Sequence, residues 1–399
     1  MGKRVTIKIK KAFISKLKSG YPLLLKEFFY DNAQLPPEGT LVHLIDEKRH
    51  FIAKGYLGIQ NKGYGWLLTD SKQQKIDSNF FTQKIKDAIN YRAKLFKNKD
   101  TTAFRLFNGE GDGIGGLTID YFDGFYLITW YSQGIYSFKE PILAALQTLV
   151  EYKGIYHKRR FDTKGQYLEG ESDYLCGKRA PEPLIVKENN INFAVYLDDG
   201  AMVGLFLDQR EVRDTIKREY AKGKSLLNTF SYTGAFSVAA ALGGAKETTS
   251  VDLAKRSLAK TKEQFCINNI DLTKQKIIVA DVFDYFKIAK KKGLSYDLIV
   301  VDPPSFARSK RKVFSAAKDY TKLLKEVIAI TNTNGVIVAS TNAANFDMKR
   351  FKTFIDKAFK ESKVRYKIEK SFSLPKDFRV SKKFPEGNYL KVLFLRKID

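Results

Sequence analysis

From residue 225 onward, short apolar segments alternate with helix-like segments, and each apolar segment ends in a polar or acidic residue. The apolar segments are Ser225–Thr229, Glu247–Asp252, Lys276–Asp281 and Leu298–Asp302. Strands that alternate with helices predict a parallel, doubly wound sheet. In such sheets ligands bind outside the carboxyl ends of the strands. The pattern therefore predicts an α/β fold with a nucleotide-type pocket in the last part of the chain.

Residues 1–72 have the features of a small β-rich unit. Val5–Lys10 and Thr40–Asp46 resemble strands, Ala53–Gly58 resembles another strand with a turn, and Lys11–Lys18 has helical spacing. Seven Lys or Arg side chains lie within the first twenty residues. A short, basic β-barrel is a common form of RNA-binding module. A solvated basic edge is the alternative interpretation.

Residues 73–190 are expected to form a second, α+β unit. A helix-like segment, Asn79–Lys97, precedes strand-like Gly116–Asp120 and Gly124–Trp130. The intervening Gly109–Gly116 can be aligned with the glycine fingerprint of dinucleotide sites. That fingerprint needs a helix after it, and here a strand-like segment follows. We therefore predict a tight glycine loop at this point.

The charge of the chain constrains its partners. Seventy Lys and Arg against forty-four Asp and Glu leave a net charge of +26, which favours polyanions through phosphate neutralisation. No apolar run approaches the ~18 residues of a membrane span, so no membrane partner is expected. The two cysteines, Cys176 and Cys266, are too few for a metal or disulfide framework. This favours a cytoplasmic protein without a metal.

The loop after the first strand indicates the class of cofactor. Gly234 lets the backbone approach a ligand closely, but a dinucleotide would require more glycines and a triphosphate a Gly-Lys-Ser/Thr sequence. Asp252 follows Gly234 by eighteen residues (252 − 234), near the ~20 typical of a ribose-binding acid. Asp281 is placed to accept from an adenine amine. Each acid alone would suit a helix N-cap, but acids at successive strand ends favour S-adenosylmethionine.

The substrate side is expected at Asp302-Pro303-Pro304-Ser305-Phe306. Proline fixes φ, so the loop is rigid and the Asp302 carboxylate is a preset acceptor. Phe306 can stack on a base turned out of its helix. Four basic residues follow and suit the phosphates around such a base: Arg308, Lys310, Arg311 and Lys312. A purely structural turn is the alternative.

Four motifs together resemble class I, S-adenosylmethionine-dependent 23S rRNA methyltransferases: Leu205–Arg210, Asn228–Gly234, Ser250–Asp252 and Asp302–Phe306. The resemblance implies a PUA-like domain at 1–72, an α+β connecting domain at 73–190 and a Rossmann-like catalytic domain at 191–399. It also implies a set of cofactor-binding residues, namely Asp208, Gln209, Arg210, Phe230, Ser231, Tyr232, Gly234, Asp252, Asp281 and Asp302.

Relatives with this domain order resemble cytosine-C5 methyltransferases. Cytosine C5 must be activated by a cysteine thiolate that adds to C6, and these enzymes carry it in Ser-Cys-Ser after the fifth strand. The matching segment here is Val338–Asn342, with Thr341 at the thiol position. Neither Cys176 nor Cys266 matches that place.

The other branch resembles the guanine-N7 half of a bifunctional 23S rRNA enzyme, whose loop is close to Asp302–Arg311. Guanine N7 has an in-plane lone pair and no proton to lose, so positioning supplies most of the catalysis. Asn342 is placed to read the edge of the base, or else to cap a helix. The resulting candidate catalytic residues are Asp302, Pro303, Pro304, Phe306 and Asn342.

We therefore expect an rRNA methyltransferase that uses S-adenosylmethionine and acts on a guanine N7 of 23S rRNA. Its partner is free 23S rRNA or an assembling large ribosomal subunit. Cytosine C5 and an exocyclic amine are the other target atoms. A non-catalytic RNA-binding assembly factor is the alternative from another class. The nucleotide position and the oligomeric state, a homodimer included, stay open.

Overall fold

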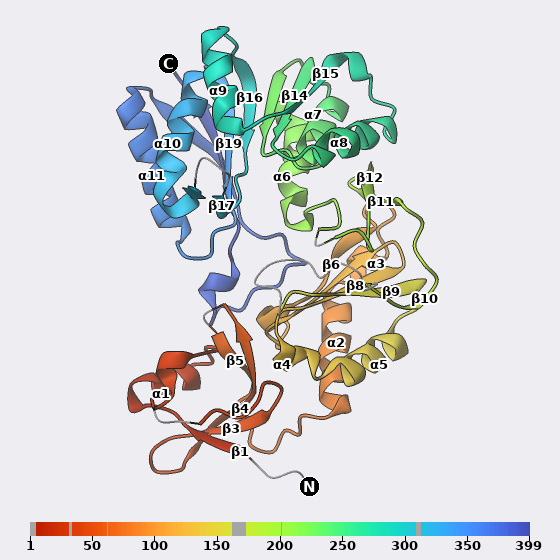
Figure 1. Cartoon of the computed structure of the whole chain (residues 1–399), viewed down its shortest axis with the longest axis vertical. Helices are drawn as coiled ribbons and strands as arrows, with labels where there is room; N and C mark the ends of the chain where they lie inside the picture. The colour runs from red at the N-terminus through yellow and green to blue at the C-terminus, as the bar shows by residue number, and fades with distance from the viewer. Residues whose placement is uncertain (1–4, 32–33, 62, 162–172, 201, 309–312) are drawn as a thin grey trace. The chain divides into compact units, whose positions relative to one another are not determined.

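The computed structural model describes residues 5–31, 34–61, 63–161, 173–200, 202–308 and 313–399 (Figure 1). The chain divides into two compact units. Unit 1 comprises residues 1–184, 196–203 and 376–387, and unit 2 comprises residues 185–195, 204–375 and 388–399. Within the described residues, no helix has both the length and the apolar character needed to cross a bilayer.

The first sheet of unit 1 confirms the expected β-rich segment. Its strands follow the order β1-β3-β4-β5-β2: β1 (Val5–Lys8), β2 (Leu23–Leu25), β3 (Leu41–Ile45), β4 (Phe51–Gln60) and β5 (Gly63–Thr69). Helix α1 (Lys11–Lys18) and the 3-10 turn η1 (Lys26–Phe28) complete it. Strand β5 was not predicted, because its glycines suggest a turn. Gly65 is required there, since a Cβ would lie 2.4 Å from the Tyr56 carbonyl oxygen.

The second sheet of unit 1 has the order β10-β9-β8-β7-β6. Its elements are α2 (Ser78–Tyr91), α3 (Ala93–Phe96), β6 (Ala103–Asn108), η2 (Gly109–Gly111), β7 (Leu117–Phe122), β8 (Phe125–Trp130), α4 (Gln133–Tyr136), α5 (Lys139–Leu149), β9 (Gly154–Arg159) and β10 (Tyr174–Gly177). The glycine segment connects antiparallel β6 and β7, as a tight loop before a strand. Buried side chains of both sheets, such as Tyr56 and Trp130, belong to one hydrophobic core.

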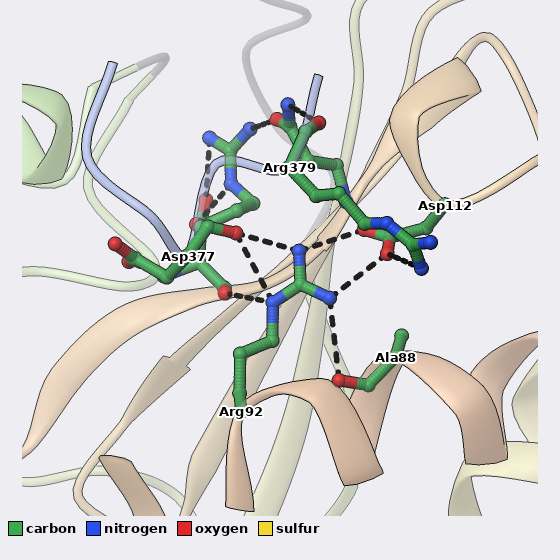
Figure 2. Close-up of polar contacts among 8 residues, drawn as sticks. Ala88, Arg92, Asp112, Asp377 and Arg379 are labelled. Carbon is green, nitrogen blue, oxygen red and sulfur yellow. Dashed lines mark hydrogen bonds and ion pairs between the residues drawn. The ribbon is translucent and has the colours of Figure 1, made fainter. Parts of the chain in front are cut away.

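A buried arginine interrupts the helix that was predicted over Asn79–Lys97. The Arg92 guanidinium forms a two-pronged ion pair with Asp112, at 2.9 and 2.7 Å, and donates to the Ala88 and Asp377 carbonyl oxygens (Figure 2). Both charged side chains of the pair are only 1% exposed. The chain leaves the helical path at Arg92, which separates α2 from α3.

The same cluster holds residues 376–387 in unit 1, although the residues on either side of that segment belong to unit 2. The Arg105 backbone N–H donates to the Asp377 carboxylate at 3.0 Å, and the Asn108 amide donates to the Arg379 carbonyl oxygen at 2.9 Å. Gly111 leaves the space for this approach, because a Cβ there would lie 1.8 Å from the Arg379 oxygen. Segment 376–387 is thus docked by buried polar contacts.

Unit 2 contains the predicted doubly wound sheet. The strand order is β15-β14-β13-β16-β19-β21-β20. The strands are β13 (Ser225–Thr229), β14 (Glu247–Asp252), β15 (Gln275–Val279), β16 (Tyr296–Val301), β19 (Thr331–Thr341), β20 (Tyr366–Phe372) and β21 (Lys391–Lys397). The first five of that order run parallel, and β21 pairs antiparallel with both β19 and β20. The predicted antiparallel pair at the sheet edge is therefore confirmed.

Helices cover both faces of this sheet (Figure 1). The helices and helical turns of unit 2 are η3 (Leu207–Gln209), α6 (Arg210–Thr215), the π-helical turn η4 (Ile216–Tyr220), α7 (Ala235–Leu242), α8 (Arg256–Cys266), η5 (Leu272–Lys274), α9 (Val282–Lys291), α10 (Ala316–Ala329) and α11 (Met348–Ser362). The 3-10 turn η6 (Pro385–Gly387) belongs to unit 1. Side chains of a strand alternate between faces. In β16, Leu298 and Val300 join the core under α6 and α7, whereas Ile299 and Val301 join the core under α9, α10 and α11.

Two small hairpins complete the described chain. Strands β11 (Leu184–Glu188) and β12 (Ile191–Val195) pair with each other before the main sheet begins. Strands β17 (Phe306–Arg308) and β18 (Val313–Ser315) pair antiparallel directly after the Asp302 loop. The Rossmann-like fold class is confirmed, while the division into domains at residues 72 and 190 remains a proposal.

Candidate active site

The order of the strands creates a place where a ligand can bind. The chain runs outward from β13 through β14 to β15 and then returns to β16 on the other side of β13. The loops after β13 and β16 therefore leave the sheet in opposite directions, which is the switch point at which α/β sheets bind ligands. The loop beginning at Phe230 and the loop beginning at Asp302 flank this point.

The loop after β13 is tightly turned. Phe230, Tyr232 and Gly234 have φ values of 55°, 50° and 79°. Positive φ is uncommon for residues with a side chain and marks strain that the surroundings must hold. A Cβ on Gly234 would lie 2.5 Å from the Thr261 methyl group, so only glycine fits. The Ser231 backbone N–H donates to the Val251 carbonyl oxygen at 3.1 Å, which ties the loop to β14.

Asp252 and Asp281 lie at the ends of β14 and β15, as predicted, and both also serve the backbone. One oxygen of Asp252 accepts from the Tyr232 N–H at 2.8 Å, and the other accepts from the Ala254 N–H at 2.9 Å. Asp281 is the N-cap of α9 and accepts from Phe283 N–H at 2.8 Å through Oδ1. A carboxylate has about four lone-pair sites, so these contacts leave acceptors for hydroxyl or amine groups of a ligand.

Asp302 is enclosed by protein at the end of β16 and keeps a small exposed surface. Its Oδ2 accepts from Gln209 Nε2 at 3.1 Å. Burial raises the pKa of Asp302 to about 6, and the neighbouring Asp208 charge adds to the rise. Hydrogen bonds from Ser340 and Gln209 and the charge of Arg213 act in the opposite direction. The two neighbouring carboxylates, Asp208 and Asp302, suit a cationic ligand.

The predicted residues Asp208, Gln209 and Arg210, at the end of η3 and the start of α6, lie next to one another in the chain. Gln209 lies between Asp302 and Ser340, and Tyr389 Oη donates to Asp208 Oδ2 at 2.9 Å. Arg210 is buried, with 7% of its surface exposed. The helix is anchored by Arg213, which forms two 2.7 Å hydrogen bonds with the buried Glu188.

The loop that begins at Asp302 presents an aromatic ring outward. Pro303 is buried and Pro304 is exposed, while Phe306 at the start of β17 is 63% exposed. Ser305 Oγ donates to Asn342 Oδ1 at 2.5 Å, which joins this loop to the one after β19. The amide nitrogen of Asn342 is then directed away from Ser305. Lys310, Arg311 and Lys312 lie outside the described residues.

Neither cysteine lies at the strand ends that form this site. Thr341, the last residue of β19, is fully buried, and its hydroxyl accepts from the Ala343 N–H at 3.3 Å. Cys266 is the exposed last residue of α8, and Cys176 belongs to β10 of unit 1. Within the described part of the chain, the ends of β13, β16 and β19 therefore carry no thiol.

Two residues of the site, Ser340 and Tyr389, were missed by the sequence reasoning. Ser340 lies one residue before the predicted thiol position, and Tyr389 lies at the start of the predicted last strand. Both could have been found only by recognising that the fifth strand, β19, pairs directly with the last strand, β21. Without the register of that pair, neither side chain could be assigned to the site.

The residues present fit S-adenosylmethionine. Asp252 and Asp281 supply acceptors at neighbouring strand ends, where ribose and adenine groups are held in sheets of this kind. Asp302 is buried and interacts with the negative charge of Asp208, so two carboxylates contribute negative charge to this region. A sulfonium and an ammonium group in one ligand would offset that charge.

Comparisons with known proteins agree with this geometry. The family of S-adenosylmethionine-dependent methyltransferases matches residues 104–376, and a PUA-like domain family matches residues 7–70. The crystal structure of SMU.776, a putative methyltransferase complexed with SAH, is similar with a TM-score of 0.92 and 41% identity. The similarity covers 98% of this chain and 100% of that one.

Curated proteins are similar over nearly the whole length. The putative ribosomal RNA large subunit methyltransferase YwbD of Bacillus subtilis is 59% identical over 391 residues, 98% of each chain. Ribosomal RNA large subunit methyltransferase I of Aeromonas salmonicida is 30% identical over 362 residues, covering 90% of this chain and 91% of the relative. The strand order, the loops at the switch point and these matches lead to one conclusion: the chain belongs to the S-adenosylmethionine-dependent methyltransferase family and carries a PUA-like domain before its catalytic fold.

Proposed function

We propose that the protein methylates the N7 atom of a guanine in 23S rRNA, as free RNA or within an assembling large subunit in the cytoplasm. The relatives named as ribosomal RNA large subunit methyltransferases support the class of substrate. The net charge of +26 favours a polyanionic partner. The choice of N7 rests on the chemistry of the residues at the strand ends.

The observation that carries this choice is Thr341 in the place of a thiol. Methylation at cytosine C5 needs a nucleophile that adds to C6 first. The Thr341 hydroxyl is buried and bonded to its own loop, and neither cysteine belongs to the strand ends. Guanine N7 needs no such nucleophile, because its lone pair forms the N–CH3 bond as the S–CH3 electron pair returns to sulfur. No proton has to leave.

Asp302 supplies the electrostatic part of this proposal. Transfer to N7 moves a positive charge from sulfur to the purine ring, and that charge stays on the product. An ionised carboxylate fixed beside the reacting groups stabilises a cation throughout the transfer, and such preorganised charge is a large term in catalysis. The low-polarity setting that raises the pKa of Asp302 also strengthens its field.

Asn342 and Phe306 supply recognition of the base. The edge of guanine that carries N7 presents two acceptors, N7 and O6. Because Asn342 Oδ1 already accepts from Ser305, its Nδ2 group is the side that can donate to O6. The exposed Phe306 ring is a stacking surface for a base turned out of its helix. Cytosine has an exocyclic amine where guanine has O6, so an amide donor fits guanine better.

Mapping of the modified nucleotide tests the proposal. We expect 23S rRNA from a strain that lacks the gene to lose one methyl group from a guanine, and purified protein to restore it. Mass spectrometry of nuclease fragments locates the methyl group, and chain cleavage after borohydride reduction identifies N7. Loss of the methyl group from a cytosine would overturn the proposal in favour of methylation at C5. An unchanged rRNA would refute 23S rRNA as the substrate.

The cysteines provide an independent prediction. Cys176→Ser and Cys266→Ser, singly and together, are expected to leave kcat and KM within about twofold of the unaltered protein, because direct transfer uses no thiol. The measurement is transfer of labelled methyl groups to rRNA from the deletion strain. A loss of a hundredfold or more in either variant, with normal folding by circular dichroism, would restore the covalent cytosine mechanism.

A further inference from the structure

Gln209 is buried at a cost in stability. Its side chain is 3% exposed, and its Oε1 atom has no hydrogen-bond partner among the residues that the structure describes. A buried acceptor without a donor is unfavourable, whereas an apolar side chain of the same length would have no such penalty. The contacts of its Nε2 group give a reason for its presence.

Both donors of the Gln209 amide point at the carboxylate region. Nε2 donates to Asp302 Oδ2 at 3.1 Å and to Ser340 Oγ at 2.9 Å. This arrangement fixes which end of the amide faces Asp302, because the reversed amide would place its oxygen against the carboxylate. Ser340 is itself held, since its carbonyl oxygen accepts from the buried Tyr320 hydroxyl at 2.9 Å.

We propose that Gln209 is a positioning residue for methyl transfer: its amide selects the orientation of the Asp302 carboxylate and keeps that group ionised. The unpaired Oε1 is the consequence of directing both N–H groups to Asp302 and Ser340. Gln209 touches neither reacting atom in this role and acts only through Asp302.

The charged groups around Asp302 determine the direction of the effect. Asp208 raises its pKa and Arg213 lowers it, and the buried Tyr320 of α10 is near enough for the Asp302 charge to raise the pKa of its hydroxyl. The hydrogen bond from Gln209 favours the ionised form, so its loss raises the pKa of Asp302 further above about 6. If methyl transfer needs the ionised carboxylate, a variant without this hydrogen bond therefore loses activity at a higher pH than the unaltered protein when the solution is acidified.

The test compares the pH dependence of kcat/KM for S-adenosylmethionine, which reports groups of the enzyme before that ligand binds. For Gln209→Met we expect the acidic limb to move up by about one pH unit and the rate at neutral pH to fall about tenfold. We expect its thermal midpoint to change little, because the gain from removing the orphaned acceptor is offset by the hydrogen bonds that Asp302 and Ser340 lose. If the role of Gln209 were purely structural, Gln209→Met would lower the thermal midpoint and leave the acidic limb of the pH profile unchanged.

Gln264 provides the matched control within unit 2. It is fully buried, but its amide is satisfied, accepting from the Ala194 N–H at 2.9 Å and donating to the Ala194 carbonyl oxygen at 2.8 Å. Gln264→Met is expected to lower the thermal midpoint without moving the acidic limb. An unmoved limb in Gln209→Met, or an equal shift in both variants, would overturn the inference.

This inference rests on the proposed function for the choice of rRNA as the methyl acceptor. Two further measurements test the two separately. Calorimetric binding of S-adenosylmethionine between pH 5 and 8 needs no RNA, and the pH at which affinity is lost should rise in Gln209→Met. Ser340→Ala should move it in the same direction, which keeps the test available if Gln209→Met folds poorly. Failure of the unaltered protein to methylate rRNA would refute the substrate alone.

Discussion

Asp302→Ala is expected to lower methyl transfer by about 100- to 1,000-fold, the loss typical when one preorganised electrostatic group is removed from an active site. The carboxylate lies at the end of β16, held by Gln209 and beside Asp208. Without it, the positive charge that moves to the base has no fixed counter-charge. The measurement is single-turnover transfer of labelled methyl groups to rRNA from the deletion strain.

The control for shape is Asp302→Asn, which keeps the size of the side chain and removes its charge. If the charge is what matters, Asn should be nearly as inactive as Ala. RNA affinity, measured by filter binding, should change less than about threefold in both variants, since RNA binding rests mainly on phosphate contacts. Substantial activity in Asp302→Asn would refute the electrostatic role and would remove the basis for the inference on Gln209.

Asp302→Asn should also raise the stability of the fold, with a defined pH dependence. The folded-state pKa of about 6 lies above the ordinary value of 3.8, so the ionised carboxylate opposes folding above pH 6. This difference corresponds to about 3 kcal/mol. Asp302→Asn should therefore be more stable than the unaltered protein at pH 7 to 8. The advantage should shrink as the pH falls through 6 and vanish near pH 4, where both folded and unfolded carboxyl groups hold a proton.

The architecture of unit 2 was predictable because it is encoded locally. Segments such as Leu298–Asp302 are apolar, short and separated by helical patterns, and these features alone indicate parallel strands with functional loops at one end. Acids at strand ends could therefore be assigned to one edge of a sheet. The additional structural role of Asp281 as an N-cap is likewise a local signal, and it was recognised as the alternative from the start.

The partners of individual side chains were not predictable, because they depend on contacts distant in sequence. Gln209 meets Ser340 across 131 residues and Asp302 across 93. Tyr389 reaches Asp208 because β21 lies between β19 and β20, an order that hydrophobic patterning does not reveal. The same limit explains the wrong expectation of one helix over Asn79–Lys97. A helical pattern cannot show that Arg92 turns inward to meet Asp112 and Asp377.

Arg92→Met is expected to destabilise unit 1 by about 3–5 kcal/mol, the usual loss when one partner of a buried ion pair is removed. Asp112 would remain 1% exposed and keep only the longer ion pair with the half-exposed Arg379, at 3.7 Å. The carbonyl oxygens of Ala88 and Asp377 would lose a charged donor at the same time (Figure 2). Because Asp377 belongs to segment 376–387, hydrogen exchange should accelerate in that segment as well as at the end of α2.

Two controls separate the buried charge from general effects of losing a cation. Lys153→Met breaks the exposed pair with Asp123, whose side chains are 54% and 41% exposed, and should cost less than about 1 kcal/mol. Adding Asp112→Asn to Arg92→Met removes the buried charge that has lost its main partner and should recover part of the loss, since Asn can still accept from the Asn108 N–H. Urea unfolding followed by hydrogen exchange measures each variant. If Arg92→Met loses no more stability than Lys153→Met, the buried pair does not hold segment 376–387 in place.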